Sequence, residues 1–76
     1  MNSSRIRDVR QLIALLDEMR SQSTASQIGR LEKIRQSLEL DEMYYEQKGN
    51  EAGKARTANC LARVSDRLSE LQRTGN

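Results

Sequence analysis

Apart from carboxylates and lysines, few side chains in this sequence carry groups that do covalent or acid–base chemistry. The 76 residues include no histidine and a single cysteine, Cys60. A thiol close to arginine side chains can become a nucleophile; the alternative is a small residue half-buried beside an apolar seam. Because no second cysteine and no histidine can supply a base or a ligand, the sequence favours neither covalent catalysis nor zinc binding. We therefore expect no enzyme activity and no cofactor.

The two tyrosines, Tyr44 and Tyr45, are the only aromatic residues. Consecutive residues on a helix point about 100° apart, so the two rings cannot share a face. Tyr44 falls beside Leu40 and Met43, on the side opposite to the main apolar stripe of its helix. Tyrosine is enriched at interface hot spots, so Leu40, Met43 and Tyr44 form a candidate partner-binding patch. The alternative is that the first helix of the chain covers this patch.

A basic ridge is the second candidate site. Arg56, Arg63 and Arg67 fall within about 40° of each other around the expected third helix, which would let them follow the phosphates of a nucleic acid. Asp66 and Glu70 lie nearby, however, and no aromatic residue alternates with the arginines to stack on a base. The alternative is a solvated flank of the helix, so we expect weak nucleic-acid binding, or none.

Charge is dense but balanced along the whole chain. Lysine and arginine number 13 and aspartate and glutamate 11, which gives a net charge of +2. This balance excludes a dedicated polyanion binder and is typical of long exposed helices. Arg5, Arg7 and Arg10 cluster at the start of the first expected helix, where positive charge opposes the helix dipole. Their placement favours an external acidic partner.

The segment Ser37-Leu38-Glu39-Leu40-Asp41 resembles the Ser-x-Glu-Leu-Asp signature of the small sporulation aspartyl-phosphate phosphatases. The match covers five residues of the expected second helix, and Leu38 stands where that family usually has glutamine. The resemblance implies a helical hairpin and a phosphatase-like regulator with Asp41 at its centre. The rest of the chain departs from the family, because it is rich in arginine, has a longer first segment and adds a third helix.

Three helices are expected to position these residues, at about 4–20, 25–47 and 51–73. The first begins at a Ser3 or Ser4 cap, and Leu15 lies at the margin of its apolar stripe. A polar break follows, in which Thr24 and Gln27 have the spacing of a capping box. The members of the stripe recur at helical spacing: Ile6, Val9, Leu12, Ile13, Leu16 and Met19.

The second helix is expected to carry its core face at Ile28, Leu31, Ile34, Leu38 and Tyr45, with Asp41 interrupting the seam and Gly29 within the helix. A second break follows, in which Gly49 suits the residue after a helix and Asn50 the N-cap of the next. The alternative is one continuous helix through Gly49 and Gly53, although two glycines so close together disfavour helix.

The third helix has a seam whose spacing alternates between four and three residues, as in a coiled coil. A core without Phe or Trp is weak in a chain of this size, so we expect this seam to support self-association as a homo-oligomer; a monomeric bundle is the alternative. The fold class is thus all-α, a single domain of residues 1–76 forming a helical hairpin or three-helix bundle with coiled-coil-like seams. The seam residues are Thr57, Leu61, Val64, Leu68 and Leu71.

Function and location follow as expectations. No stretch approaches the roughly 18 apolar residues of a membrane span, and charged residues follow Met1–Ser4 where a signal peptide would be apolar. A free cysteine suits the reducing cytoplasm. We expect a small protein-binding module that docks a helix face on another protein, as phage-encoded inhibitors, secretion chaperones and regulator antagonists do. A small basic nucleic-acid-binding regulator is the second hypothesis, and a sporulation-phosphatase-like regulator the third.

Overall fold

A computed structural model describes residues 9–74 of the chain, and they form three helices. These are α1 (Val9–Met19), α2 (Thr24–Lys48) and α3 (Glu51–Thr74), and no strand occurs within residues 9–74. The predicted all-α fold is confirmed. The expected start of the first helix, with its serine cap, Ile6 and the arginines at 5 and 7, lies outside the described residues.

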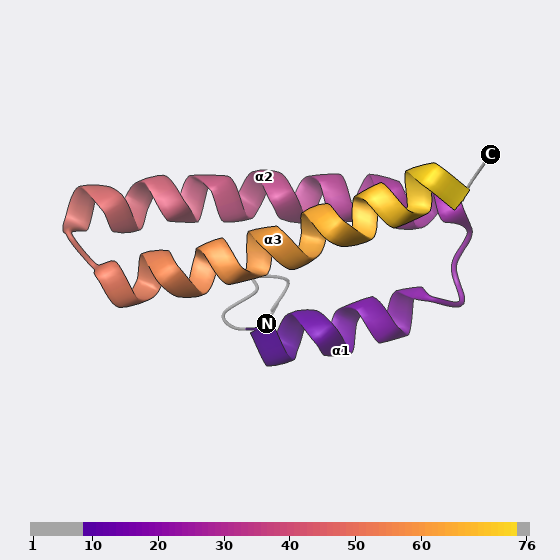
Figure 1. The fold of residues 1–76 in the computed structure, drawn as a ribbon, viewed down its shortest axis with the longest axis horizontal. Helices are drawn as coiled ribbons and strands as arrows, with labels where there is room; N and C mark the ends of the chain where they lie inside the picture. Colours follow the sequence, from indigo (N-terminus) through magenta and orange to yellow (C-terminus); the bar gives the residue numbers. More distant parts are fainter. Residues whose placement is uncertain (1–8, 75–76) are drawn as a thin grey trace, which may run out of the picture.

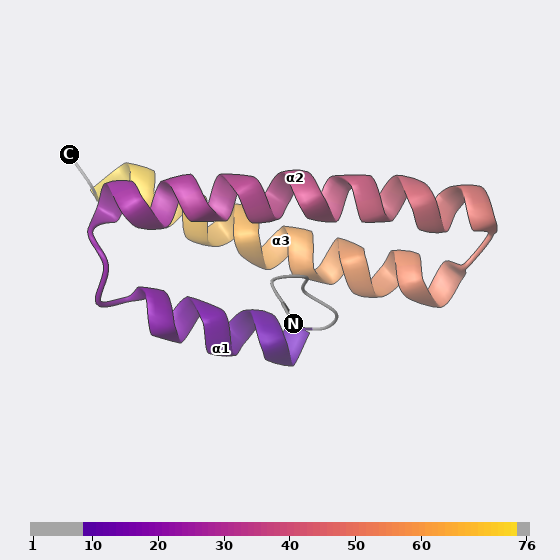
Figure 2. The same cartoon turned by 180° about the vertical axis from the view of Figure 1, so that it is seen from behind.

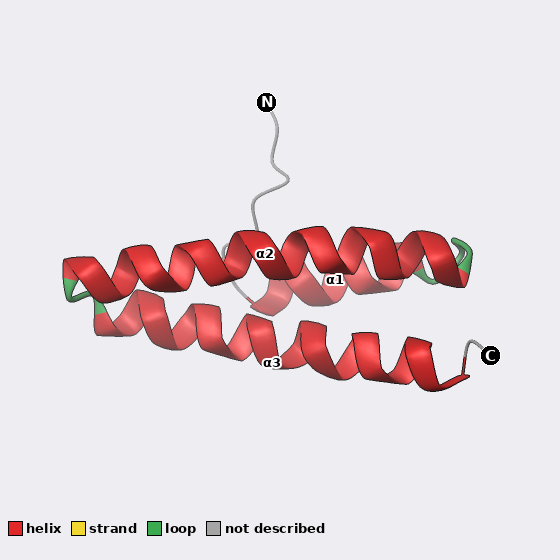
Figure 3. Cartoon of the chain, turned by 90° about the horizontal axis from the view of Figure 1, so that it is seen from above, coloured by secondary structure: helices red, strands yellow, loops and turns green. Residues whose placement is uncertain are grey.

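The helices α2 and α3 run antiparallel as a long hairpin, with α1 beside one half of it (Figure 1). From behind, α1 again lies along the half that contains the start of α2 and the end of α3 (Figure 2). Seen from above, α2 and α3 lie side by side along their length (Figure 3). The tip of the hairpin, where α2 turns into α3, therefore extends beyond α1.

The start of α2 is capped one residue earlier than the sequence suggested. Ser23 is the N-cap, and its side-chain oxygen accepts a hydrogen bond from the Ser26 backbone N–H at 3.1 Å. The predicted capping box from Thr24 to Gln27 is therefore wrong. Gln27 is buried and donates from Nε2 to the backbone oxygen of Gln22 at 2.8 Å. This bond ties the α1–α2 connection to the first turn of α2.

The turn between α2 and α3 has the predicted caps. Gly49 adopts the left-handed conformation, with φ 71°, which costs glycine little because it has no Cβ. Asn50 then accepts a hydrogen bond at Oδ1 from the Gly53 N–H at 2.9 Å, which is the geometry of an N-cap. The alternative of one continuous helix through Gly49 is wrong, whereas Gly53 does lie inside α3.

The core is formed by all three helices. On α1, Leu12 and Met19 are fully buried, and Leu15 packs against the core although it lies at the margin of the predicted stripe. Ile13, predicted in that stripe, is exposed instead. The helix is thus rotated slightly from the orientation expected, so that Leu15 takes the place of Ile13. The other buried apolar residues are Leu31, Leu38, Cys60, Val64, Leu68 and Leu71.

The predicted self-association seam belongs to this core. Val64, Leu68 and Leu71 are buried within one chain, and Leu61 is half-buried and packs against the same cluster. A second copy could reach these side chains only if the hairpin opened. Self-association stays a prediction, and it requires a surface other than the one proposed from the sequence.

Candidate functional site

Three large apolar side chains stand exposed on the outer side of α2. The exposed fractions are 66% for Leu40, 59% for Met43 and 54% for Tyr44. Isolated exposed leucines are common on protein surfaces, but these three side chains are neighbours on one helix face. Together they form the apolar patch of Leu40, Met43 and Tyr44. The alternative that the first helix covers this patch is wrong, because α1 does not lie over it. The partner-binding role of the patch stays a prediction.

Helix length explains why the patch is uncovered. The 11 residues of α1 span about 16 Å, whereas the 25 residues of α2 span about 37 Å. The α1 helix lies along the other half of the hairpin, against α3 (Figures 1 and 2). Because α1 packs on that half, no other helix in the described part of the chain is available to cover the patch.

Tyr44 is held in place although it is exposed. Its ring meets the ring of Tyr45 edge to face, with centroids 5.6 Å apart and planes at 66°. The Nζ atom of Lys48 lies 5.7 Å from the centroid of Tyr44. Edge-to-face pairs and cations over aromatic rings each contribute about 0.5–1 kcal/mol at such sites. The patch therefore presents an aromatic side chain whose position is partly set before any partner arrives.

Tyr45 turns inward and packs on a glycine of α3. A Cβ atom built on Gly53 would lie 2.7 Å from two ring carbons of Tyr45, so only a hydrogen fits there. The sequence pattern marks Gly53 as a helix-breaking residue and does not reveal this contact. Two features of the sequence could have indicated the contact: Gly53 lies within an expected helix, and Tyr45 is the one aromatic residue predicted to face inward.

A short polar chain continues from this contact into α3. The buried Thr57 hydroxyl donates to the backbone oxygen of Gly53 at 2.9 Å. The N–H of the same glycine donates to Asn50. Thr57, predicted as the first member of the α3 seam, is therefore buried with its hydroxyl satisfied. The inner side of the hairpin tip is thus held by hydrogen bonds and by the contact of Tyr45 with Gly53, while its outer side bears the patch.

The patch lies in an acidic stretch of a basic chain. Residues 36–47 contain four acidic side chains and no lysine or arginine, a net charge of −4. Since the whole chain carries +2, the rest carries +6. One of the four, Glu46, approaches Lys54 of α3 at 3.9 Å, but the Glu46 side chain is exposed and that of Lys54 only half-buried, and such pairs are weak. The four residues are Glu39, Asp41, Glu42 and Glu46.

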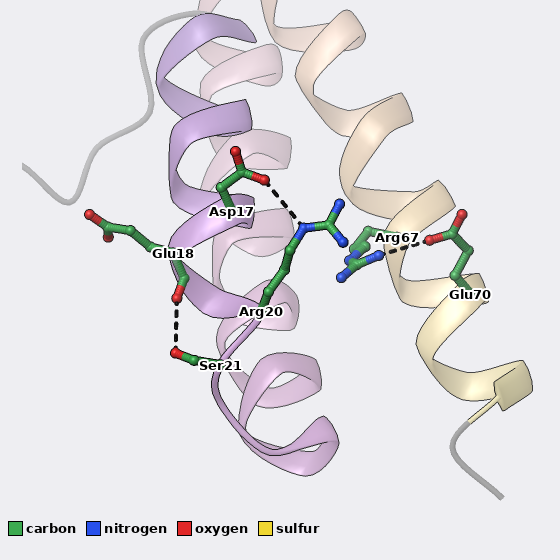
Figure 4. A network of polar contacts seen from close by, with 6 residues as sticks. All are labelled: Asp17, Glu18, Arg20, Ser21, Arg67 and Glu70. Carbon is green, nitrogen blue, oxygen red and sulfur yellow. Dashed lines mark hydrogen bonds and ion pairs between the residues drawn. The ribbon is translucent and has the colours of Figure 1, made fainter.

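The basic ridge is only partly free to bind a ligand. Arg56 and Arg63 are exposed, whereas Arg67 is half-buried and pairs with Glu70 at 3.0 Å. Figure 4 shows this pair on α3 near a second pair at the end of α1, between Asp17 and Arg20, the residue that follows the helix, at 3.2 Å. Arg67 and Arg20 each have a carboxylate three residues away in the sequence beside them. The described ridge therefore offers two exposed cations and a third whose charge is offset.

The remaining chemical candidates have little support in the described structure. Cys60 is 1% exposed and belongs to the core, so an external reactant cannot reach its thiol. Within residues 9–74, no group of three or more metal-ligating side chains comes together. None of the helices described is long and apolar enough to cross a membrane.

Comparisons with protein-family models, with curated proteins and with solved structures gave no match to this chain. The likeness of residues 37–41 to the sporulation phosphatases thus rests on those five residues alone. In the structure Ser37 is exposed and Asp41 is half-buried, both on α2. Any functional assignment has to come from the surfaces described above.

Proposed function

We propose that this protein is a small, non-enzymatic binding module of the cytoplasm that docks the outer face of α2 onto another protein. The observation that carries the proposal is the exposure of Leu40, Met43 and Tyr44 as one patch. Exposing three adjacent large apolar side chains is unfavourable in water, and such patches mark interaction sites. The other large aliphatic side chains of α2 and α3 are buried in the core or packed against it.

The composition of the patch supports the same role. Tyrosine is enriched among hot-spot residues, and a methionine adapts its shape to a partner surface. Tyr44 loses less conformational freedom on binding than a free side chain would, because Tyr45 and Lys48 already contact its ring. Inhibitors, chaperones and antagonists of regulators, including phage-encoded and secretion-related ones, are the classes that act by occupying a partner surface in this way.

A second candidate is a nucleic-acid-binding regulator that uses the exposed arginines of α3. Arg56 and Arg63 favour it, because both are accessible on the same flank. The pairing of Arg67 with Glu70 weighs against it, as does the lack of an aromatic side chain among the described residues of that flank. The docking role therefore ranks first.

The test compares two lysine substitutions in an affinity capture from cells that produce the protein. Met43→Lys places a charge in the patch, while Ala62→Lys places the same charge on an exposed position of α3 away from it. We expect the wild type and Ala62→Lys to capture one or more proteins in similar amounts. The captured amount should fall at least about tenfold with Met43→Lys. Circular dichroism should show both variants folded. Equal capture by the two variants would contradict the proposal.

A further inference from the structure

Three glutamates of α2 form a row beside the patch. Glu32, Glu39 and Glu46 are spaced by seven residues, and a seven-residue step returns to nearly the same side of a helix, with a drift of about 20°. Glu39 and Glu46 are exposed and Glu32 is half-buried. The row runs along most of α2, on the flank that faces Lys54 of α3 at the hairpin tip.

The patch itself has the spacing of a second helix-packing seam. Gln36, Leu40, Met43 and Gln47 are separated by four, three and four residues, which is the alternation of the core positions in a coiled coil. All four side chains are exposed. Each glutamate at 39 and 46 directly precedes a residue of this seam. In a coiled coil, charged residues at that flanking position select the partner and its orientation.

Building on the docking function above, we propose that the outer face of α2 binds an amphipathic helix of another protein, whose apolar stripe is flanked by lysine or arginine. The apolar side chains of that helix pack on Leu40, Met43 and Tyr44. Its cationic side chains lie over the row of Glu32, Glu39 and Glu46. Complementary charge along the seam sets the register of the helix and accelerates its association.

A second copy of this chain does not supply the same match. In an antiparallel pairing through the seam, the glutamate rows of the two copies would face each other, and like charges repel. In a parallel pairing, Glu39 would face Tyr44 of the other copy rather than a cation. An anionic nucleic acid is disfavoured on this face for the same reason. The charge of −4 over residues 36–47 thus points to a cationic protein partner.

The ion pair between Glu46 and Lys54 is compatible with this occupant. The two side chains are 67% and 38% exposed and separated by 3.9 Å, so the pair costs little to break. Glu39 is exposed about two turns before Glu46, and Tyr44 lies on the opposite flank of the seam. A helix lying in the seam therefore meets carboxylates on one side and, on the other, the Tyr44 ring with Lys48 beside it.

The experiment is a display selection with the full-length folded protein as bait. The probe is a library of 21-residue helices with a leucine seam, in which the flanking positions vary among lysine, glutamate and glutamine. Two further baits are used in parallel. One changes Glu32, Glu39 and Glu46 to Gln and keeps the patch, and the other changes Leu40, Met43 and Tyr44 to Ser and keeps the charge.

We expect lysine to be enriched at the flanking positions on the wild-type bait, and the preference to vanish on the glutamine bait. A selected lysine-flanked peptide should bind the glutamine variant about tenfold more weakly than the wild type. Enrichment without a charge preference would overturn this inference while leaving the docking function intact. If the wild-type bait enriches no peptides relative to the serine bait, the docking function is overturned as well. If the free protein sediments as a dimer and the serine variant as a monomer, the face binds a second copy of the chain instead.

Discussion

The two halves of the hairpin use the same kind of residue for different purposes. In the half covered by α1, the leucines of α2 and α3 are buried against Leu12 and Met19. At the tip, apolar residues lie on both sides of α2: Tyr45 faces α3, while Leu40 and Tyr44 face outward. The buried core is thus concentrated where three helices meet, whereas the two-helix tip exposes apolar surface that folding does not bury.

A pair of identical substitutions on α2 gives the largest expected contrast. Leu31 is fully buried and Leu40 is 66% exposed. Leu31→Ala should lower the free energy of unfolding by about 2–5 kcal/mol, because it removes buried methylenes and leaves a cavity. Leu40→Ala should change it by less than about 0.5 kcal/mol. Urea unfolding followed by circular dichroism measures both, and comparable losses would mean that the tip is covered in solution.

The adjacent tyrosines provide a second contrast within the tip. Tyr45→Ala should destabilise the protein by about 1–2 kcal/mol, less than a fully buried aromatic residue would, because Tyr45 is half-buried. Tyr44→Ala loses the edge contact and the nearby lysine, and should cost less than about 1 kcal/mol while weakening partner binding. Thermal melts of the two variants report the stabilities. If Tyr44→Ala unfolds the protein, Tyr44 is a core residue.

Two glycines within helices should respond to alanine with opposite signs. Gly29 has open space where a Cβ would lie, so Gly29→Ala should stabilise by about 0.5–1 kcal/mol through helix propensity. At Gly53 the new Cβ would overlap the ring of Tyr45, and the required shift should turn the gain into a loss of about 1 kcal/mol. Each kcal/mol shifts the melting temperature by about 4–8 °C. Stabilisation by both variants would show that Tyr45 does not rest on Gly53.

The smallest effect is expected from the basic ridge. Changing Arg56, Arg63 and Arg67 together to Gln should alter stability by less than about 1 kcal/mol, because the ion pair of Arg67 with Glu70 is exposed on its glutamate side. Binding to labelled DNA and RNA should be weak and independent of sequence for the wild type, and weaker for the variant. A tight, sequence-selective complex at physiological salt would move the functional surface from the tip to α3.

The sequence predicted the three helices, the turn at Gly49 and Asn50, and the inward face of α2 well. These features depend on local spacing, glycine and polar caps, which a sequence displays directly. It did not predict that Leu15, rather than Ile13, packs against the core. The rotation of α1 about its axis depends on how its side chains fit against the other helices. For the same reason the sequence pattern assigned Val64, Leu68 and Leu71 to self-association, whereas the hairpin itself buries them.

The candidate site shows the same division. Helical spacing sufficed to separate Leu40, Met43 and Tyr44 from the core face. Their exposure depended on how far α1 extends along the hairpin, which is a property of packing. The close approach of Tyr45 to Gly53 likewise joins residues from two helices, and spacing along one helix carries no record of it.

The most direct test of the docking surface is photo-crosslinking in the cells that produce the protein. A benzoylphenylalanine replaces Tyr44 in one variant and the exposed Ala62 of α3 in the other. Irradiation should give a discrete adduct with another protein at position 44, and that adduct should be absent at position 62. The same adducts from both positions, or none at position 44 while position 62 reacts, would contradict the account.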